Sequence, residues 1–459
     1  MPFQGETASY APLKRIVENQ RIKELIKDWK IQKHEPREKQ WKNGTLCSGN
    51  EFASFCVPNL VLAVDGSRAE SDIKNGFPCA TVGYVTVASV LLDMKKVREV
   101  EASDFIDPIA VRQTETVSSM EAVLPGANIV STGEKNAKST FRRVLFDTLK
   151  RNQIFPGCET LLDTYEHLLK LKLSRVNGDN NPPKSPIEGL EEEKMQYGYG
   201  EYICEKSGEA LFSTDALRLH ELMNDSTSNA DMFTQTMATL EKLWFVHILR
   251  SFEQNQWLSI LHKIAFVLDG PLAVFGTSSW LARFISEEIK RINIKQKEVS
   301  GQDQDLIILG VEKTGAFVNH FESIDTSSEG VKDQFPRKKA LLLSDYYIKQ
   351  NIIFSNVENG KPYGQDTYFG RKLFYKTSNG QRIVASIATY TNEQADISTA
   401  NKEQFPRLAD ILNLLDKVYS SRYPNAILPL VSAHAEAAIP LHLGNAIFEK
   451  MAKELKNNN

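Results

Sequence analysis

The chain has 459 residues, of which 41% are hydrophobic and 25% are charged, and this composition is typical of a globular protein. The net charge of −3 argues against a broadly basic surface, so any binding of nucleic acid requires a local positive region or a partner. The sequence has no apolar run of about 18 residues and no signal-peptide stretch near its start, and its five cysteines are widely spaced. We therefore expect a cytoplasmic protein with no membrane-spanning helix and with reduced thiols.

The first part of the chain, residues 1–56, is predicted to be a helical N-terminal extension. Residues 10–42 carry many charges, with apolar residues at helical spacing, which is typical of a helix on the protein surface. Residues 60–70, "LVLAVDGSRAE", and residues 80–94 are apolar runs separated by a turn that contains glycine and proline. Together they predict a hairpin of two buried strands.

Residues 105–230 are predicted to form a large, mainly helical insertion. Within it, residues 177–194 are rich in proline, asparagine, glycine and glutamate, which predicts a mobile loop. After the insertion, the pattern predicts a long buried helix over residues 229–254, and then a strand, a helix and a second strand. This order implies parallel pairing in a mixed sheet flanked by helices, so the sequence predicts an α/β fold.

The rest of the chain completes the predicted main domain, which extends over residues 57–445. Residues 369–390 predict a second hairpin, and a helix is expected near residues 404–420. Residues 446–459 are predicted to be a C-terminal helix and tail, because the apolar residues at 445–457 recur at helical spacing.

Two of the predicted strands end in an aspartate that is followed by glycine. These are Asp65 in "LVLAVDGS" and Asp269 in "IAFVLDG". The carboxyl ends of strands in α/β sheets are common positions for binding and catalytic groups. An Asp-Gly pair is also common in ordinary turns, and this second interpretation stays open for both aspartates.

A third carboxylate, Glu241, lies within the apolar part of the long helix. A buried carboxylate is costly unless it is paired or bound to a metal, and Arg250, Lys242 or a tyrosine are alternative partners. Glu253, at the polar end of the same helix, is the other candidate for a functional carboxylate. Three such carboxylates suit Mg²⁺ or Mn²⁺, which favours the hydrolysis of phosphodiesters.

Four segments together resemble the NurA nuclease family. They are "VDGSR" on the first strand, the helix glutamate, "LDGPL" on the later strand, and "YPNAILPLVSAHAEAAIP" near the C-terminus. The resemblance covers residues 57–445. It implies a ribonuclease-H-like core with long insertions that cuts DNA with a divalent metal, usually Mn²⁺ or alternatively Mg²⁺. It also implies a homodimer that encloses a DNA channel and works beside a HerA-like hexameric ATPase.

The resemblance also implies roles for individual acidic residues. Asp65 corresponds to the first-strand aspartate of the family and Asp269 to the aspartate of the later strand. Glu241 is our assignment for the helix glutamate, although it lies 28 residues before Asp269, and Glu253 stays the alternative.

The C-terminal motif of the family adds a histidine and a tyrosine. His434, in "SAHAEA", corresponds to the histidine that assists at the metal site, either as a ligand or as a proton shuttle. Tyr423 corresponds to the tyrosine that precedes it and is predicted to bind the substrate. Taken alone, a histidine among small apolar residues is more often a core group, and His442 is the alternative histidine in this region.

Four basic residues are predicted to contact the DNA substrate. Arg68 follows the first aspartate and Lys313 ends another apolar strand, while Arg371 and Lys372 lie among aromatic residues in the segment 362–382. For Arg68 the alternative is a surface ion pair. For the segment 362–382 the alternative is a hairpin with aromatic rings in the core and charges in solvent.

The sequence thus predicts a divalent-metal-dependent deoxyribonuclease that works with a HerA-like motor, in DNA end processing and repair or in phage defence. A non-catalytic subunit with the same fold, which binds DNA or docks on the motor, is the first alternative. A metal-dependent phosphohydrolase that acts on small nucleotides is the second.

Overall fold

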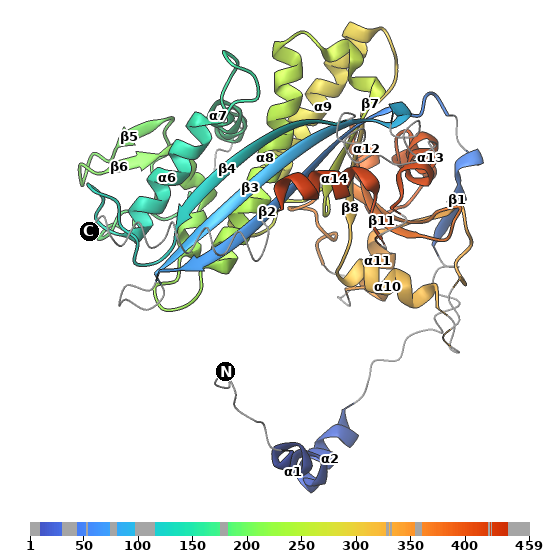
Figure 1. Cartoon of the computed structure of the whole chain (residues 1–459), viewed down its shortest axis with the longest axis horizontal. Coiled ribbons are helices and arrows are strands. Elements are labelled where there is room, and N and C mark those ends of the chain that lie inside the picture. Colours follow the sequence, from blue (N-terminus) through green and yellow to red (C-terminus); the bar gives the residue numbers. More distant parts are fainter. Residues whose placement is uncertain are drawn as a thin grey trace.

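The computed structural model describes most of the chain: residues 10–29, 44–51, 54–73, 80–96, 115–174, 182–326, 330, 333–353, 360–420, 423 and 425–438. Its central element is a nine-stranded sheet with helices on both faces (Figure 1). The prediction of an α/β fold with a mixed sheet flanked by helices is therefore confirmed. No helix in the described part of the chain is long and apolar enough to cross a membrane.

The strands of the sheet follow the order β1-β9-β10-β11-β8-β7-β2-β3-β4. Their bounds are β1 Thr45–Ser48, β2 Leu60–Asp72, β3 Thr81–Asp93, β4 Glu115–Pro125, β7 Ile264–Asp269, β8 Ile307–Glu312, β9 Lys339–Leu342, β10 Gly370–Lys376 and β11 Arg382–Ala388. A separate two-stranded sheet pairs β5 (Glu201–Ile203) with β6 (Ala210–Phe212).

The pairing of the strands confirms three expectations from the sequence. The strands β2 and β3 form the predicted first hairpin, and β10 and β11 form the second. The strands β7 and β8 run parallel to each other and are connected by helix α9 (Leu281–Ser300). In addition, β7 runs parallel to β2, but only over Leu60–Val64, whereas β2 continues beside β3 to Asp72.

The other helices have the following bounds: α1 Ala11–Glu18, α2 Gln20–Asp28, α6 Ala137–Arg151, α7 Leu161–Leu173, α8 Ala230–Gln254, α10 Ala316–Ile324, α11 Asp345–Asn351, α12 Asn392–Ala395, α13 Leu408–Val418 and α14 Leu428–Ala437. Short 3-10 helices lie at Gly49–Glu51, Ser213–Leu217, Leu219–Leu222, Leu258–Lys263, Gly276–Ser278 and Lys402–Gln404. The long buried helix predicted over 229–254 is α8, and the helix predicted near 404–420 is α13.

Two cores lie on opposite faces of the central strands. On one face, helices α6, α7, α8 and α9 contribute to a core that includes Trp244, Phe266 and Phe141. On the other face, α13 and α14 cover residues such as Val61 and Val267. Because β2 and β7 are covered on both faces, they read in the sequence as continuous apolar runs. A third core joins α10 and α11 to strands β9, β10 and β11.

The turn after β7 folds back tightly over the sheet. Gly270 has a φ of +72°, a backbone conformation that favours glycine. Its carbonyl oxygen lies close to Gly310 of β8, because a Cβ atom added to Gly310 would be only 2.4 Å from this oxygen. A few residues later, Ala273 pairs with Tyr368 in the segment that precedes β10. The end of β7 is therefore tied to the half of the sheet that contains β10.

The insertion predicted over residues 105–230 is less helical than expected. It contains α6 and α7, but β4 is the edge strand of the main sheet, and β5 and β6 pair separately. The described residues of the predicted mobile loop, 182–194, contain no helix or strand beyond an isolated bridge between Lys184 and Lys194. The hydrophobic pattern did not distinguish an insertion from an additional strand of the sheet.

Within the described residues 10–29, the N-terminal extension forms two short helices, α1 and α2, and not one continuous helix as expected. Helix α2 begins after Asn19, whose side chain accepts a hydrogen bond from the backbone N–H of Ile22. None of the residues in α1 and α2 is buried. The C-terminal helix predicted at 445–457 lies outside the described residues, and the predicted domain boundaries stay predictions.

One buried histidine on α8 makes the stability of the fold dependent on pH. His247 is fully buried, and its Nδ1 lies 2.8 Å from Thr164 Oγ1. Burial lowers the pKa of His247 from 6.5 to about 4, so the unfolded chain takes up a proton at a higher pH than the folded protein does. The free energy of unfolding should therefore decrease as the pH falls from about 6.5 towards 4, and this residue should contribute about 2 kcal/mol of the loss between pH 7 and pH 5.

Denaturant unfolding of the wild type and of His247→Gln at the two pH values tests this expectation. The variant lacks the titrating group, so it should lose less stability on acidification than the wild type. Equal losses in the two proteins would contradict a neutral, buried imidazole.

Candidate active site

The two strand aspartates lie side by side at the place where β7 ends. Val64 of β2 is in register with Leu268 of β7, so the next residues, Asp65 and Asp269, lie at the same level. The apolar residues that alternate with this pair along both strands, such as Val61 and Val267, belong to the core under α13 and α14. By the two-residue period of a strand, the aspartates therefore point to that face.

The prediction that both aspartates end their strands is correct for Asp269 and wrong for Asp65. Asp65 is paired with Ala88 in the middle of the hairpin, and Gly66 after it continues the strand opposite Val87. On its other side, Asp65 lies where the pairing of β2 with β7 ends, and we call this place the opening in the sheet. The Asp-Gly pair at 65–66 resembled a turn in the sequence, but its glycine has a different function.

Gly66 provides the space that Glu241 occupies. A Cβ atom on Gly66 would lie 2.5 Å from Glu241 Oε1 and 3.0 Å from Glu241 Cγ. Glu241, on α8, is 6% exposed, and burial raises its pKa to about 7. The ammonium of Lys242 opposes this shift, and the negative charges of Asp65 and Asp269 add to it. Glu241 thus reaches the two aspartates from the opposite face of the sheet, beside a residue that has no side chain.

Of the two helix glutamates, Glu241 is the one that lies near the aspartates. Glu253 lies about 18 Å further along α8. It accepts hydrogen bonds from Arg291 and Lys295, and the bond from Arg291 is the main reason that the pKa of Glu253 falls to about 2. It therefore belongs to an ion-pair cluster that joins α8 to α9.

Two lysines enter the cluster of carboxylates. Lys313, the first residue after β8, places its Nζ 2.8 Å from Asp269 Oδ1 and 3.7 Å from Asp65 Oδ2. Lys242 places its Nζ 3.3 Å from Glu241 Oε2 and 3.2 Å from the backbone oxygen of Asp269. The sequence suggested Lys242 only as a partner of Glu241. The two adjacent charged residues, Glu241 and Lys242, in an otherwise apolar stretch of helix are the sequence pattern that could have identified Lys242 as part of the site.

His434 reaches the site from α14. Its Nδ1 lies 3.0 Å from Asp65 Oδ2, and this hydrogen bond raises the pKa of His434. The histidine side chain is 57% exposed, whereas the Asp65 side chain is almost completely buried. The structure therefore places His434 between Asp65 and solvent.

The donor atoms at this site fit a hard divalent cation in chemical type, because carboxylate oxygens are the ligands that Mg²⁺ and Mn²⁺ prefer. Asp269 Oδ1 is buried, and the charged group beside it is the ammonium of Lys313 at 2.8 Å. Burial, followed by the charge of Asp65, raises the pKa of Asp269. As they stand, however, no three His, Cys, Asp or Glu side chains among the described residues converge closely enough to enclose an ion.

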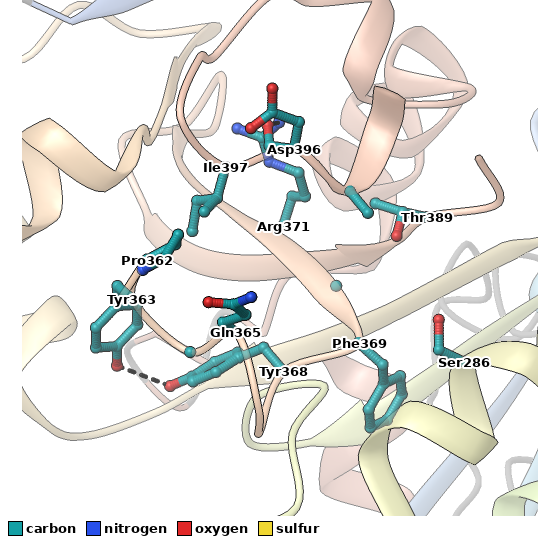
Figure 2. A pocket seen from close by; sticks show the side chains of 13 residues that line it. Ser286, Pro362, Tyr363, Gln365, Tyr368, Phe369, Arg371, Thr389, Asp396 and Ile397 are labelled. Atoms are coloured by element: carbon teal, nitrogen blue, oxygen red, sulfur yellow. Dashed lines mark hydrogen bonds between the residues drawn. The ribbon is translucent and has the colours of Figure 1, made fainter. Parts of the chain in front are cut away.

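The expectation that Arg371 and Lys372 face DNA is wrong for this structure, because both side chains are buried. The Arg371 guanidinium donates to the backbone carbonyl oxygens of Asp396 and Thr399, and burial lowers the pKa of Arg371 to about 10. Figure 2 shows Arg371 among the residues that line a cavity of about 330 Å³.

Lys372 forms an ion pair with Glu312 and lies 4.0 Å from the centre of the Phe317 ring. Its neighbour in the same strand, Lys376, is also buried and pairs with Asp325. The alternative interpretation, with these charges in solvent, is therefore wrong as well. In β10 the alternation of basic and aromatic residues corresponds to a buried strand whose lysines form ion pairs with acidic residues inside the protein.

The remaining predicted residues have simpler surroundings. Arg68 is exposed on β2, three residues after Asp65. Tyr423 is 43% exposed, and its backbone N–H donates to the hydroxyl of Ser420 in the segment before α14. His442 lies outside the described residues. The substrate-binding roles of Arg68 and Tyr423 stay predictions.

Comparison with known proteins identifies the nuclease family to which the chain belongs. A family model described as the NurA domain matches residues 59–439. The chain therefore belongs to the NurA family of nucleases, and the resemblance inferred from the sequence is confirmed. No curated protein matches the chain.

The solved structures that match the chain include three of NurA proteins. The crystal structure of the NurA nuclease from Sulfolobus solfataricus is 10% identical, covers 98% of this chain and 99% of that chain, and has a TM-score of 0.34. A crystal structure of NurA with manganese is 12% identical, covers 93% and 92%, and has a TM-score of 0.22. Another NurA crystal structure is also 12% identical, covers 97% and 96%, and has a TM-score of 0.29. Because these sequence identities and TM-scores are low, the assignment of the chain to the NurA family rests on the match to the family model.

The contact between Gly66 and Glu241 predicts a specific coupling between the two positions. In Gly66→Ala, the new methyl group meets the Glu241 side chain, so we expect a loss of roughly 1–3 kcal/mol in the free energy of unfolding. In a Glu241→Ala background the same substitution should cost much less, because its three nearest atoms all belong to Glu241. Denaturant unfolding of the four proteins measures this difference. A cost that is the same in both backgrounds would show that Gly66 is required for another reason.

Proposed function

We propose that the protein is a divalent-metal-dependent deoxyribonuclease that hydrolyses phosphodiester bonds. Asp65, Glu241 and Asp269 would hold Mn²⁺ or Mg²⁺, and His434 would assist. The main support is that two aspartates from parallel strands and a glutamate from a buried helix gather at one opening in the sheet. Membership of a nuclease family supports the same reaction class.

A ribonuclease-H-like core is part of this proposal. The five strands β4-β3-β2-β7-β8 support it, because β2, β3 and β4 form an antiparallel meander and β7 and β8 run parallel to β2. Asp65 lies within β2 and Asp269 ends β7, so both carboxylates belong to this five-stranded unit.

The chemistry follows from what each residue contacts. A divalent cation bound to the carboxylates would lower the pKa of a water molecule and stabilise the charge on a phosphoryl oxygen. His434 holds Asp65 through Nδ1 and, from its exposed position, can pass a proton to the leaving 3′-oxygen. Lys313 can donate a charge-assisted hydrogen bond to a phosphate oxygen, and Arg68 can contact the DNA backbone further along β2.

The proposed partners are DNA, a second copy of the chain and a HerA-like hexameric ATPase, in the cytoplasm. Family membership supports the motor partner. A basic lining that is shared between subunits or supplied by the motor would reconcile DNA binding with the net charge of −3. A motor and nuclease pair suits both the processing of DNA ends in repair and defence against phage.

A second function, as a non-catalytic subunit that binds DNA or docks on the motor, is favoured by one observation. Both Lys242 and Lys313 already place ammonium groups against the carboxylates. If these ion pairs were permanent, the fold would be retained without metal-dependent cleavage.

Cleavage of end-labelled single-stranded and double-stranded DNA tests the proposal. Activity is measured with EDTA, Mg²⁺ or Mn²⁺, with and without a HerA-type ATPase. We expect metal-dependent cutting that decreases by at least about 100-fold in Asp65→Asn and in Asp269→Asn, because each removes a charged oxygen ligand. Asp303→Asn, at an exposed aspartate paired with Lys297, is the matched control and should keep full activity.

Two other results would change the conclusion. If the folded wild type cuts no DNA under any of these conditions, the non-catalytic function replaces the proposal. If it hydrolyses small nucleotides and long DNA does not compete, it is a small-molecule phosphohydrolase.

A further inference from the structure

The two lysines of the site differ in how firmly they are held. The side chain of Lys242 is 5% exposed and that of Lys313 is 30% exposed. Both ammonium groups lie within 4 Å of carboxylate oxygens that we assign to a metal ion. The difference in exposure decides which of them can move.

Lys242 is held in place by the fold. Its ammonium donates to the backbone carbonyl oxygen of Asp269 as well as to Glu241 Oε2. A backbone carbonyl at the end of β7 cannot leave without unfolding of the strand. Moving this buried ammonium would also leave Asp269 O without its partner. Lys242 therefore connects α8 to β7 whether or not a metal is bound.

Lys313 is held mainly by charge. Its ammonium lies 2.8 Å from Asp269 Oδ1 and 3.7 Å from Asp65 Oδ2, so both of these contacts are with carboxylate oxygens, whereas Lys242 also binds a backbone carbonyl oxygen. Lys313 also lies just beyond the end of β8, where its four-carbon side chain can turn outwards into solvent. It can leave the site at little structural cost.

We propose that Lys313 is an exchangeable cation that competes with the divalent metal ion for Asp65 Oδ2 and Asp269 Oδ1. This inference rests on the proposed function. A metal ion on Asp269 Oδ1 and Asp65 Oδ2 would lie within a few Å of the ammonium that is 2.8 Å from Asp269 Oδ1, and two positive charges at such a separation repel in a partly buried site. In the absence of metal, Lys313 neutralises the two aspartates. A divalent ion displaces it and leaves the ammonium free to face the substrate.

The competition predicts that loss of Lys313 increases the affinity for the metal and decreases the stability of the metal-free protein. Removing the lysine should make metal binding tighter, because the ion no longer displaces another cation. It should also make the metal-free protein less stable, because two neighbouring carboxylates lose their counter-charge. Adding the metal should then restore the stability.

Mn²⁺ binding to Lys313→Met and to the wild type tests the inference, with free Mn²⁺ measured by electron paramagnetic resonance. We expect the affinity of the variant to be higher on the order of tenfold. The melting temperature of the variant should be lower than that of the wild type in EDTA and should recover in saturating Mn²⁺. Neither readout depends on catalysis.

Lys297→Met is the matched control. Lys297 is 28% exposed and also bridges two aspartates, with Nζ 2.9 Å from Asp303 Oδ1 and 2.8 Å from Asp305 Oδ1. It lies at the end of α9. This control should leave the Mn²⁺ affinity unchanged, so a general effect of losing one positive charge can be recognised. Lys313→Gln provides a second variant if the methionine impairs folding.

The outcomes separate the inference from the proposed function. If the wild type binds Mn²⁺ and cuts DNA, but Lys313→Met and Lys313→Gln bind Mn²⁺ equally or more weakly, the competition is overturned and the nuclease assignment stands. If Mn²⁺ binding is absent in the wild type, or is unchanged in Asp65→Asn, the metal site itself is wrong and both conclusions fail.

Discussion

The unequal lengths of two adjacent parallel strands determine the rest of the site. Strand β7 stops at Asp269, whereas β2 continues beside β3 to Asp72, and the sheet opens at the level of Asp65. At that opening the next residue of β2 is a glycine, so a side chain from the helix on the other face can reach between the strands. Groups from both faces of the sheet meet there, although a continuous sheet would keep them apart.

The opening also explains how several like charges can lie together. Glu241 is enclosed by apolar neighbours on α8, so its carboxylate is the one whose ionised form is most disfavoured. Two ammonium groups and one imidazole compensate the three acids from different directions. One is fixed by a main-chain carbonyl, and the others are partly open to solvent. Removing any single cation changes the balance for all three carboxylates, so these residues act as one electrostatic unit.

The sequence predicted the parts of this arrangement that depend on local pattern. Apolar runs identified the strands, and an acidic residue within each run identified Asp65 and Asp269. The position of Asp65 in mid-strand was not predictable, because the continuation of β2 beyond Gly66 depends on its pairing with β3 and not on the residues around Asp65. The burial of Arg371 and Lys372 was missed for a similar reason. Their carbonyl and carboxylate partners lie far along the chain, and the local alternation of basic and aromatic residues gives no sign of them.

The hydrogen bond between His434 and Asp65 joins residues that are 369 positions apart in the sequence. Contacts of such long range form late, after the chain between them has been made and folded. During synthesis the first aspartate emerges long before the histidine, and β7 with Asp269 follows only after the long segment that contains α6, α7 and α8. A nascent chain that has not yet reached His434 therefore lacks this hydrogen bond, even when the strands that carry Asp65 and Asp269 have already been made. The contact of the imidazole with Asp65 is thus the last of the described contacts at this cluster that can form during synthesis.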